Sequence, residues 1–569
     1  MEQIYRKVAE LIAKGDFEKL PQLPISKPQK FNWVSEVFEA IHVKERPDSC
    51  ALLWTDGETV QRYSFATLAK QTNQLVSFLR SKGVKQKDVI LMQMALLPSN
   101  WLSILATIKG GFCLVPAATI LGVNDIVYRF GKLMPKVVVA DEENATKIDE
   151  AELLSGKSVA VKLLTKGTKD GWYTLNDVDA ESTEALPAET LADDPLFLFF
   201  TSGTTGMPKV VVHTHLSYPL GHLTTASWVG LQAGDIHYNI SQPGWAKFAW
   251  SSFFAPWSIG ATIFAYHQPG RFSAKATLDA IARHKVTTFC APPTVLRMLI
   301  LEDLKKYDFS LRECVAAGEP LNPEVIEQWL RGTGITIRDG FGQTESSCLV
   351  GNLPGSKPRY GSMGKSLFLY DVVIADDAGN ILPDNEEGNI CVRMNTGKPN
   401  GIFTDYYGEP EKKESVFRNG LYYTGDKAYR DTEGYIWFVG RDDDVIKSSD
   451  YRVGPFEVES VLLEHEMVQE SAVIGSPHTI KGFEVKAFVV LNSGFAAGPE
   501  IAHQLFAFAN KNLAPYKMPR LIEFVAELPK TISGKIRRVE LRAKEAETKA
   551  RDIVNTQEYR YQLSRKPEV

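Results

Sequence analysis

The chain has 569 residues, which is too long for one compact core, so two or more domains are expected. Hydrophobic residues make up 44% and charged residues 23%, as in ordinary globular proteins. The formal net charge of -5 is small for this length and argues against nucleic-acid binding as the main function.

The N-terminal segment, residues 1–17, has the pattern of a polar amphipathic helix and lacks the apolar core of a signal peptide. No stretch of the chain reaches the apolar length that a membrane span needs. The six cysteines are scattered and form no C-x-x-C pair, which favours buried free thiols in a reducing compartment over a disulfide framework or a zinc site. They are Cys50, Cys113, Cys290, Cys314, Cys348 and Cys391. The cytoplasm is therefore the expected location.

Helical and strand-like patterns alternate along much of the chain, which predicts an α/β protein. A helix is expected over residues 64–80, with Ser64 as its N-cap and Gly83 just beyond its end. The short apolar runs at residues 196–200 and 287–290 are typical of buried strands in a parallel sheet.

The segment TSGTTGMPK, residues 201–209, directly follows the first of these apolar runs. Its glycines let the backbone turn tightly, its hydroxyl side chains donate hydrogen bonds, and Lys209 adds a positive charge, so the segment suits a polyphosphate. An ordinary surface turn rich in serine, threonine and glycine is the alternative. The segment does not fit the Walker motif, because Pro208 stands where the second glycine is needed. The motifs of dinucleotide oxidoreductases, serine hydrolases and zinc proteases are also missing from the chain.

Four further segments combine glycine with charged or hydroxyl residues, and two of them follow strand-like runs at residues 314–316 and 335–337. In chain order the segments are AGEP (317–320), DGFGQTE (339–345), YTGD (423–426) with YIWFVGR (435–441), and KTISGKIRR (530–538). Taken singly, each has a common structural explanation as a loop, a turn or a basic tail.

The pattern changes near Gly440, where the charged run at residues 441–444 precedes what reads as a small α+β unit. Strands are expected at residues 471–474 and 485–491, and a helix at residues 500–512.

In this order, the motifs resemble those of the adenylate-forming superfamily, and most of all its medium-chain acyl-CoA synthetase branch. The resemblance runs from about Phe31 to Arg538. It implies an α/β fold with a large N-terminal adenylate-forming domain of packed sheets and helices, residues 1–441, and a small mobile α+β C-terminal domain, residues 442–569, that carries the catalytic lysine. It implies an AMP-forming carboxylic acid:CoA ligase that uses ATP, Mg²⁺ and coenzyme A.

The resemblance also implies roles for individual residues. Lys535 is expected to bridge the substrate carboxylate and the α-phosphate, Thr344 to contact the α-phosphate, and Glu345 to hold Mg²⁺, which prefers oxygen ligands. Asp426 is expected to accept hydrogen bonds from the ribose hydroxyls, with Arg441 assisting. The remaining nucleotide-binding residues are Thr201, Ser202, Gly203, Thr204, Thr205, Gly206, Lys209, Gly318, Glu319, Pro320, Asp339, Gly340, Phe341 (a tyrosine in many relatives), Gly342 and Gln343.

Transfer to coenzyme A is expected to follow a rotation of the small domain about a hinge at Asp443. The residues that the resemblance places beside coenzyme A are Ser449, Tyr451, Arg452 and Lys481. Asp450 stands where the family normally has glycine. The change is either harmless at the surface or a sign of altered acceptor use, because a carboxylate repels the phosphates of coenzyme A.

Gly342 predicts a substrate larger than acetate, because acetate-specific relatives place a tryptophan there. Short- to medium-chain aliphatic acids are the first expectation and aromatic acids the second. The candidate acyl-pocket residues, each of which core packing also explains, are Trp245, Gly342 and Ala291, with Phe248 and Trp250 beside them. The alternatives are an adenylating enzyme with an acceptor other than coenzyme A, and a nucleotide-binding sensor, against which Glu345, Asp426 and Lys535 speak.

The expected partner is a small-molecule carboxylic acid, with no nucleic acid and no membrane span. A homodimer is compatible with the resemblance. So are an acetyltransferase and a deacetylase acting on Lys535, because relatives with a similar Pro-Lys-x-x-Ser-Gly-Lys context are regulated in this way and acetylation removes the lysine charge.

Overall fold

The computed structural model describes residues 1–201, 208–268, 270–394, 397–442, 444–448, 451–478, 482–530, 535–551, 553 and 555–561. The chain divides into two compact units, residues 1–372 with 393–420 and residues 373–392 with 421–569. The boundary expected between residues 441 and 442 separates the large domain from the small domain that is predicted to move. It stays a prediction.

One sheet of the first unit contains the strands that lead to two of the predicted motifs. Its core is parallel, and β12 pairs with β10 on one side and β13 on the other, which confirms the buried parallel strand expected near residues 287–290. The strand order is β16 (Lys365–Ser366), β15 (Cys348–Gly351), β14 (Ile337–Gly342), β13 (Glu313–Ala316), β12 (Thr288–Ala291), β10 (Ile236–Asn239), β11 (Thr262–Tyr266), β1 (Cys50–Thr55) and β2 (Val60–Ser64).

The second sheet of this unit contains the strand before the expected phosphate loop. That strand, β8, is parallel to β4 but antiparallel to β9, so the expectation of a parallel strand holds on one side only. The order is β19 (Asp405–Tyr406), β9 (Lys209–Thr214), β8 (Pro195–Thr201), β4 (Cys113–Pro116), β3 (Val89–Gln93), β5 (Val137–Ala140), β6 (Val161–Leu164) and β7 (Tyr173–Thr174).

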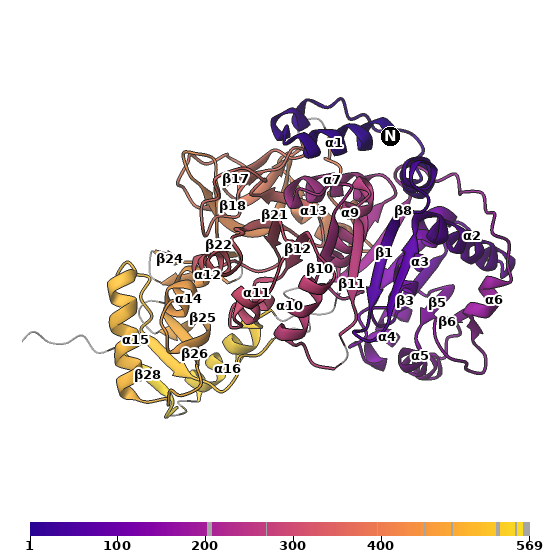
Figure 1. The fold of residues 1–569 in the computed structure, drawn as a ribbon. Coiled ribbons are helices and arrows are strands. Elements are labelled where there is room, and N and C mark those ends of the chain that lie inside the picture. Colours follow the sequence, from indigo (N-terminus) through magenta and orange to yellow (C-terminus); the bar gives the residue numbers. More distant parts are fainter. Residues whose placement is uncertain are drawn as a thin grey trace, which may run out of the picture. The chain divides into compact units, whose positions relative to one another are not determined.

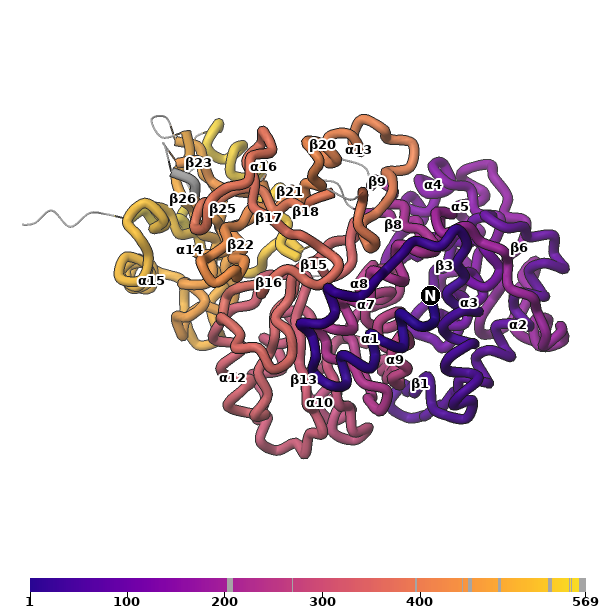
Figure 2. Tube along the Cα trace, turned by 90° about the horizontal axis from the view of Figure 1, so that it is seen from above, coloured from indigo at the N-terminus to yellow at the C-terminus, as the bar shows by residue number. Residues whose placement is uncertain are grey.

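Helices cover both sheets, and Figure 1 shows α2 and α3 beside the strands of the second. Helix α2 begins as predicted, because the Ser64 hydroxyl accepts a hydrogen bond from the Thr67 N–H at 3.1 Å. Helix α1 lies against α7 and α9 (Figure 2). The helices of this unit are α1 (Glu2–Lys14), α2 (Phe65–Ser81), α3 (Ser99–Gly110), α4 (Val123–Lys132), α5 (Glu142–Ser155), α6 (Leu175–Asp179), α7 (Ser217–Val229), α8 (Ala246–Ala249), α9 (Ala255–Ile259), α10 (Ala274–Arg283), α11 (Pro293–Leu299), α12 (Pro323–Thr333) and α13 (Pro410–Val416), with π-helices η2 (Val34–Val43) and η3 (Trp250–Phe254) and 3-10 helices η1 (Phe17–Gln22) and η4 (Leu304–Lys306).

The second unit is α+β, as expected. Strand β18 (Gly388–Arg393) lies between β17 (Val372–Ala375) and β21 (Leu421–Arg430), and β22 (Ile436–Arg441) pairs with β21. A further sheet has the order β24 (Tyr451–Val453), β23 (Ile446–Ser448), β26 (Gly482–Leu491), β27 (Leu521–Phe524) and β28 (Glu558–Arg560), with β25 (Val468–His478) beside β26. Its helices are α14 (Pro455–Leu463), α15 (Pro499–Asn512) and α16 (Arg538–Ala550), so the predicted strands and helix at residues 471–512 are confirmed.

Three further expectations from the sequence have clear outcomes. All six cysteines are free, and five of them are buried, with Cys50 partly exposed. Within the described ranges, no helix combines the length and the apolar character that crossing a membrane requires. The strand expected at residues 335–337 begins only at Ile337 and runs on to Gly342, because its end pairs antiparallel with β15. Asp339, Gly340 and Phe341 therefore lie within the strand and not after it.

Candidate active site

The expected phosphate loop joins two antiparallel strands. Thr201 and Lys209 are paired across the β8–β9 ladder, and the residues between them that the sequence assigns to the nucleotide, Ser202, Gly203, Thr204, Thr205 and Gly206, lie outside the described residues. The strand ends are held in place. The Tyr128 hydroxyl donates to the Pro208 carbonyl at 2.8 Å, and the Arg129 guanidinium lies 4.7 Å from the centre of the Phe200 ring.

Lys209 and Glu345 meet at the base of this hairpin. The Lys209 ammonium lies 2.8 Å from a Glu345 carboxylate oxygen and donates to the Tyr406 hydroxyl at 2.8 Å. That hydroxyl donates to the same Glu345 oxygen at 3.0 Å. Burial alone would raise the pKa of Glu345, but the Lys209 charge and the Tyr406 hydrogen bond lower it below its ordinary value. The carboxylate is therefore charged at neutral pH, as a magnesium ligand must be.

The segment 339–344 is fixed mostly through its backbone. The Asp339 carbonyl accepts from the Trp228 indole N–H at 3.1 Å, and the buried Asp339 carboxylate accepts from the Gly340 N–H at 2.9 Å. A Cβ on Gly340 would lie 2.5 Å from the Trp228 ring, which explains the glycine. Gln343 N–H donates to Ser346, and the Thr344 carbonyl lies 2.7 Å from a His213 ring nitrogen.

The AGEP turn that follows β13 is supported by helix α11 and the segment before η3. Gly318 has φ +109°, a conformation that favours glycine. The Glu319 carboxylate accepts from the Thr294 hydroxyl at 2.6 Å and pairs with Arg297 at 3.2 Å. Lys247 donates to the Ala317 carbonyl at 2.8 Å. Pro320 ends the turn, which lies between β13 and α12 in the chain.

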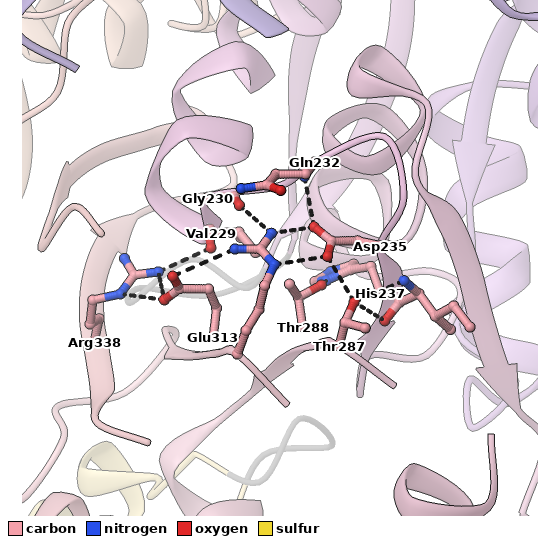
Figure 3. Close-up of polar contacts among 11 residues, drawn as sticks. Val229, Gly230, Gln232, Asp235, His237, Thr287, Thr288, Glu313 and Arg338 are labelled. Atoms are coloured by element: carbon pink, nitrogen blue, oxygen red, sulfur yellow. Dashed lines mark hydrogen bonds and ion pairs between the residues drawn. The ribbon is translucent and has the colours of Figure 1, made fainter. Parts of the chain in front are cut away.

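Two arginines that sequence reasoning missed fasten β13 and β14 to the C-terminus of α7 (Figure 3). Buried Arg338 pairs with Glu313 at 2.8 Å and donates to the carbonyls of Trp228 and Val229. Arg312 donates to the Gly230 carbonyl at 2.5 Å and to the Asp235 carboxylate at 2.9 Å. The last carbonyls of a helix have no partner within it, so these guanidinium groups complete the helix end. Neither arginine belongs to a recognisable motif, so the sequence alone does not distinguish it from any other charged residue beside a strand.

Of the candidate acyl-pocket residues, Trp250 lies directly beside Gly342. A Cβ on Gly342 would lie 2.4 Å from the Trp250 ring and 2.4 Å from the Ser347 carbonyl oxygen. Ala291 is fully buried at the end of β12, Phe248 packs on Trp101, and Trp245 is half-buried before α8. The volume directly beside residue 342 is therefore taken by an indole from η3, and the expectation of a substrate larger than acetate stays a prediction.

In the second unit, the predicted ribose-binding pair is brought together. Asp426 and Arg441 are direct partners on the β21–β22 ladder, and Asp426 is buried. The next residue, Lys427, donates to Asn389 at 2.8 Å and pairs with Asp442 at 3.1 Å.

Lys535, the expected catalytic lysine, is exposed and directly precedes Ile536, which forms an isolated bridge with Lys530 before α16 begins. On either side of the predicted coenzyme A segment, Ser448 of β23 pairs with Tyr451 of β24, and Ser448 also pairs with Gly482. Ser449, Lys481 and the hinge residue Asp443 lie outside the described residues, as does Asp450, and the side chains of Tyr451 and Arg452 do too.

Comparison with protein families gives two matches. The model described as AMP-binding enzyme matches residues 40–407, and the model described as AMP-binding enzyme C-terminal domain matches residues 457–535. The predicted phosphate and adenine motifs and Lys535 fall within these matches.

Similar proteins extend over nearly the whole chain. The 4-hydroxybutyrate–CoA ligase 1 of Metallosphaera sedula is 48% identical, with 93% of each chain covered. The mitochondrial acyl-coenzyme A synthetase ACSM3 of Mus musculus is 39% identical, also with 93% of each covered. The crystal structure of the anthranilate CoA ligase AuaEII with anthranoyl-AMP is 30% identical, covers 94% of this chain and 100% of that chain, and has a TM-score of 0.85.

Proposed function

Because the chain belongs to the AMP-binding enzyme family, we propose that it is an AMP-forming ligase that joins a short- or medium-chain carboxylic acid to coenzyme A. The observation that carries the proposal is the contact of half-buried Lys209 with buried Glu345 and Tyr406 at the base of the phosphate hairpin, a charged centre of the kind that phosphoryl transfer needs. The 48% identity to a 4-hydroxybutyrate–CoA ligase over 93% of both chains supports the same reaction.

In the first half-reaction, a carboxylate oxygen of the acid attacks the α-phosphorus of ATP, and the bond to pyrophosphate breaks. Both reactants are anions, so the residues need to position and neutralise them rather than supply a nucleophile. Lys535 is proposed to bridge the carboxylate and the α-phosphate, Thr344 to contact that phosphate, and the segment from Thr201 to Lys209 to hold the leaving pyrophosphate. The Glu345 carboxylate fits Mg²⁺ in charge and ligand type, and the ion, when bound, would neutralise phosphate charge.

In the second half-reaction, the thiol sulfur of coenzyme A attacks the acyl carbon, its proton is released, and the bond to AMP breaks. Lys535 has no anion to bridge in this step. We propose that the small domain turns about Asp443 and brings the residues from Ser449 to Arg452, with Lys481, to the thiol arm. Acetylation of Lys535 would stop the first step alone, because only that step needs the charge.

The decisive experiment is ATP–pyrophosphate exchange with a panel of aliphatic and aromatic acids, followed by detection of the thioester with free coenzyme A. Exchange and thioester formation with a short aliphatic acid are expected. A preference for benzoate or anthranilate would favour an aromatic substrate, which the 30% identity to an anthranilate CoA ligase supports as the second candidate. Exchange without a thioester would indicate another acceptor, and no exchange with any acid would favour a nucleotide-binding sensor.

A further inference from the structure

Strand β9 presents two polar side chains to the segment that contains Thr344 and Glu345. Residues four apart on a strand point to the same face, and Lys209 and His213 are four apart on β9. The valines at alternate positions point to the other face, into the apolar core beside the sheet. Lys209 contacts the Glu345 carboxylate, whereas His213 contacts the backbone one residue earlier. One strand face therefore holds both predicted residues, the first through its backbone and the second through its side chain.

The His213 ring donates a hydrogen bond to the Thr344 carbonyl. Its Nε2 atom lies 2.7 Å from the carbonyl oxygen, and a carbonyl can only accept, so Nε2 carries a proton. The ring is fully buried, and burial lowers its pKa to about 4, so it is uncharged at neutral pH and has this N–H alone as a donor. The other nitrogen, Nδ1, is buried and has no hydrogen-bond partner within the described residues. The polar contact of His213 is thus directed at Thr344.

Two aromatic neighbours fix the orientation of the His213 ring. Tyr218 of α7 stacks on it, with ring centres 4.0 Å apart and an angle of 26° between the planes. Phe199 of β8 approaches it edge-on, with ring centres 6.2 Å apart. Because neighbours pack on the ring from two directions, the Nε2–H stays aimed at the Thr344 carbonyl. A donor that is already oriented needs no reorganisation when the reaction occurs.

The carbonyl of the next residue is held by a different element. The Phe403 N–H, two residues before β19, donates to the Glu345 carbonyl at 2.8 Å. The two held carbonyls belong to the peptide planes on either side of the Glu345 Cα, and each peptide unit is rigid. The two contacts together therefore set the direction in which the Glu345 side chain leaves the backbone, and the His213 contact also fixes the backbone of Thr344.

We propose that His213 is a positioning residue for the adenylation step, in which its Nε2–H holds the peptide between Thr344 and Glu345 so that both side chains face the reacting phosphate. The inference rests on the proposed ligase function and adds a residue to its site. His213 acts through its hydrogen bond to the backbone and is not itself placed at the reactants. A displacement of about 1 Å in a reacting site can lower the rate about 100-fold, so one anchoring hydrogen bond has a large effect on the rate.

The test measures kcat for ATP–pyrophosphate exchange in the full-length protein with three substitutions of His213. His213→Phe keeps an aromatic ring for stacking but removes the donor. His213→Gln places an amide N–H near the position of Nε2, whereas His213→Asn places its shorter amide near the position of Nδ1. The rate should fall about 100-fold in the phenylalanine and asparagine variants, and the glutamine variant should recover to within about tenfold of the unsubstituted protein. A role in packing alone would not distinguish glutamine from asparagine in this way.

The matched control is His215→Phe. His215 lies two residues further along the chain and is also fully buried, and neither of its ring nitrogens has a hydrogen-bond partner in the part of the chain that the structure describes. The control should keep the exchange rate of the unsubstituted protein. Equal losses in the glutamine and asparagine variants of His213, or an equal loss in His215→Phe, would overturn the inference and assign the histidine to packing. A failure of the proposed function gives a different result, because no acid then supports exchange in the unsubstituted protein.

Discussion

At the scale of single residues, the charge of the candidate site depends on the Glu345 carboxylate. Lys209 and Tyr406 both contact one of its oxygens and lower its pKa against the opposing effect of burial. Magnesium, when bound, would therefore share this carboxylate with Lys209.

We predict that Tyr406→Phe slows adenylate formation by removing a hydrogen bond to the Glu345 carboxylate. The substitution removes one hydrogen bond to a charged carboxylate, so the rate of ATP–pyrophosphate exchange should fall about tenfold. A group with a lowered pKa is charged above that pKa and loses its charge as the pH falls through it. Without the hydroxyl the pKa of Glu345 rises, so the acid limb of the pH–rate profile should move to higher pH.

The control is Tyr407→Phe, because the neighbouring Tyr407 is 48% exposed. Its pH–rate profile should match that of the unsubstituted protein. An acid limb that stays in place in Tyr406→Phe would mean that the hydroxyl does not act through Glu345.

Lys535 allows a prediction about the two half-reactions. Lys535→Gln removes the charge in the way that acetylation does, and exchange should fall about 1000-fold because one group that stabilises the transition state is lost. Thioester formation from supplied acyl-adenylate should be unchanged. Lys544→Gln on the same domain, with a side chain 68% exposed, should affect neither. Equal losses in both half-reactions would contradict the proposed division of roles.

The sequence predicts two of the three residues that meet at the base of the phosphate hairpin. Lys209 and Glu345 belong to ordered motifs and can be named from the sequence. Tyr406 cannot, because it reaches Glu345 only through the pairing of the two-residue strand β19 with β9. Trp250 was a candidate for the acyl pocket, but only the structure shows that its ring fills the space beside Gly342.

At the scale of elements, α7 connects the parts of the first unit that carry the site. Its C-terminal carbonyls receive Arg338 and Arg312, and its small residue Gly221 lies so close to Gly401 that a Cβ would be 2.4 Å from the Gly401 backbone. Strand β14, with Asp339 and Gly340, is thereby fixed against the helix. The segment around Asp339 and Gly340 is therefore held by packing against α7 and by the buried Arg338, and not only by contacts within the segment itself.

We predict that Arg338→Met loosens β14. The substitution leaves Glu313 without its buried partner and the α7 carbonyls without a donor, and loss of one member of a buried pair destabilises by about 3–5 kcal/mol. Thermal unfolding should begin at a lower temperature, and the KM for ATP should rise more than that for the acid. Arg331→Met on α12, where the side chain is 63% exposed, is the control and should change neither. An unchanged KM for ATP would show that Arg338 does not affect nucleotide binding.

Element types were predictable where periodic patterns are long or bounded by clear signals. The helix after Ser64, the helix over residues 500–512 and strand β8 have such patterns. Strand β14 was misplaced because Asp339-Gly340 resembles a turn in the sequence, whereas the pairing of Gly340 with Gly351 in β15 extends the strand. Long-range pairing of this kind leaves no local signal.

At the scale of the whole molecule, the second unit contains a cluster of ion pairs that joins several of its elements. Within the described residues, three glutamates are close enough to hold a metal ion, but the Lys486 ammonium already lies among them, 2.5–2.7 Å from Glu523, Glu545 and Glu558. This ion cluster joins β26, β27, α16 and β28. The cytoplasmic location and a homodimer remain predictions, which fractionation and sedimentation can test.

The last prediction concerns the hinge. Asp442, before the predicted pivot, is held by the β21–β22 sheet through Gly425 and Lys427, whereas Asp444, after it, pairs with Arg542 and Arg538 of α16. The Asp444 N–H also donates to the Arg441 carbonyl at 3.0 Å, so Asp442 and Asp444 both contact the β21–β22 pair and Asp444 in addition contacts α16. Proline fixes φ at about -65° and removes an N–H, so Asp443→Pro should hold one orientation of the small domain.

Thioester formation should then fall about 100-fold, the effect of misplacing a reactant, while adenylate formation falls less than about threefold. Single-turnover rates measured separately for the two half-reactions provide the test. Asp443→Ala, which leaves φ free, is the matched control and should retain both rates. If both rates fall in parallel in the proline variant, the pivot lies elsewhere in the segment between β22 and β23. If the alanine variant shows the same selective loss, the carboxylate and not the rotation is responsible, because alanine removes the side chain but leaves the backbone able to turn.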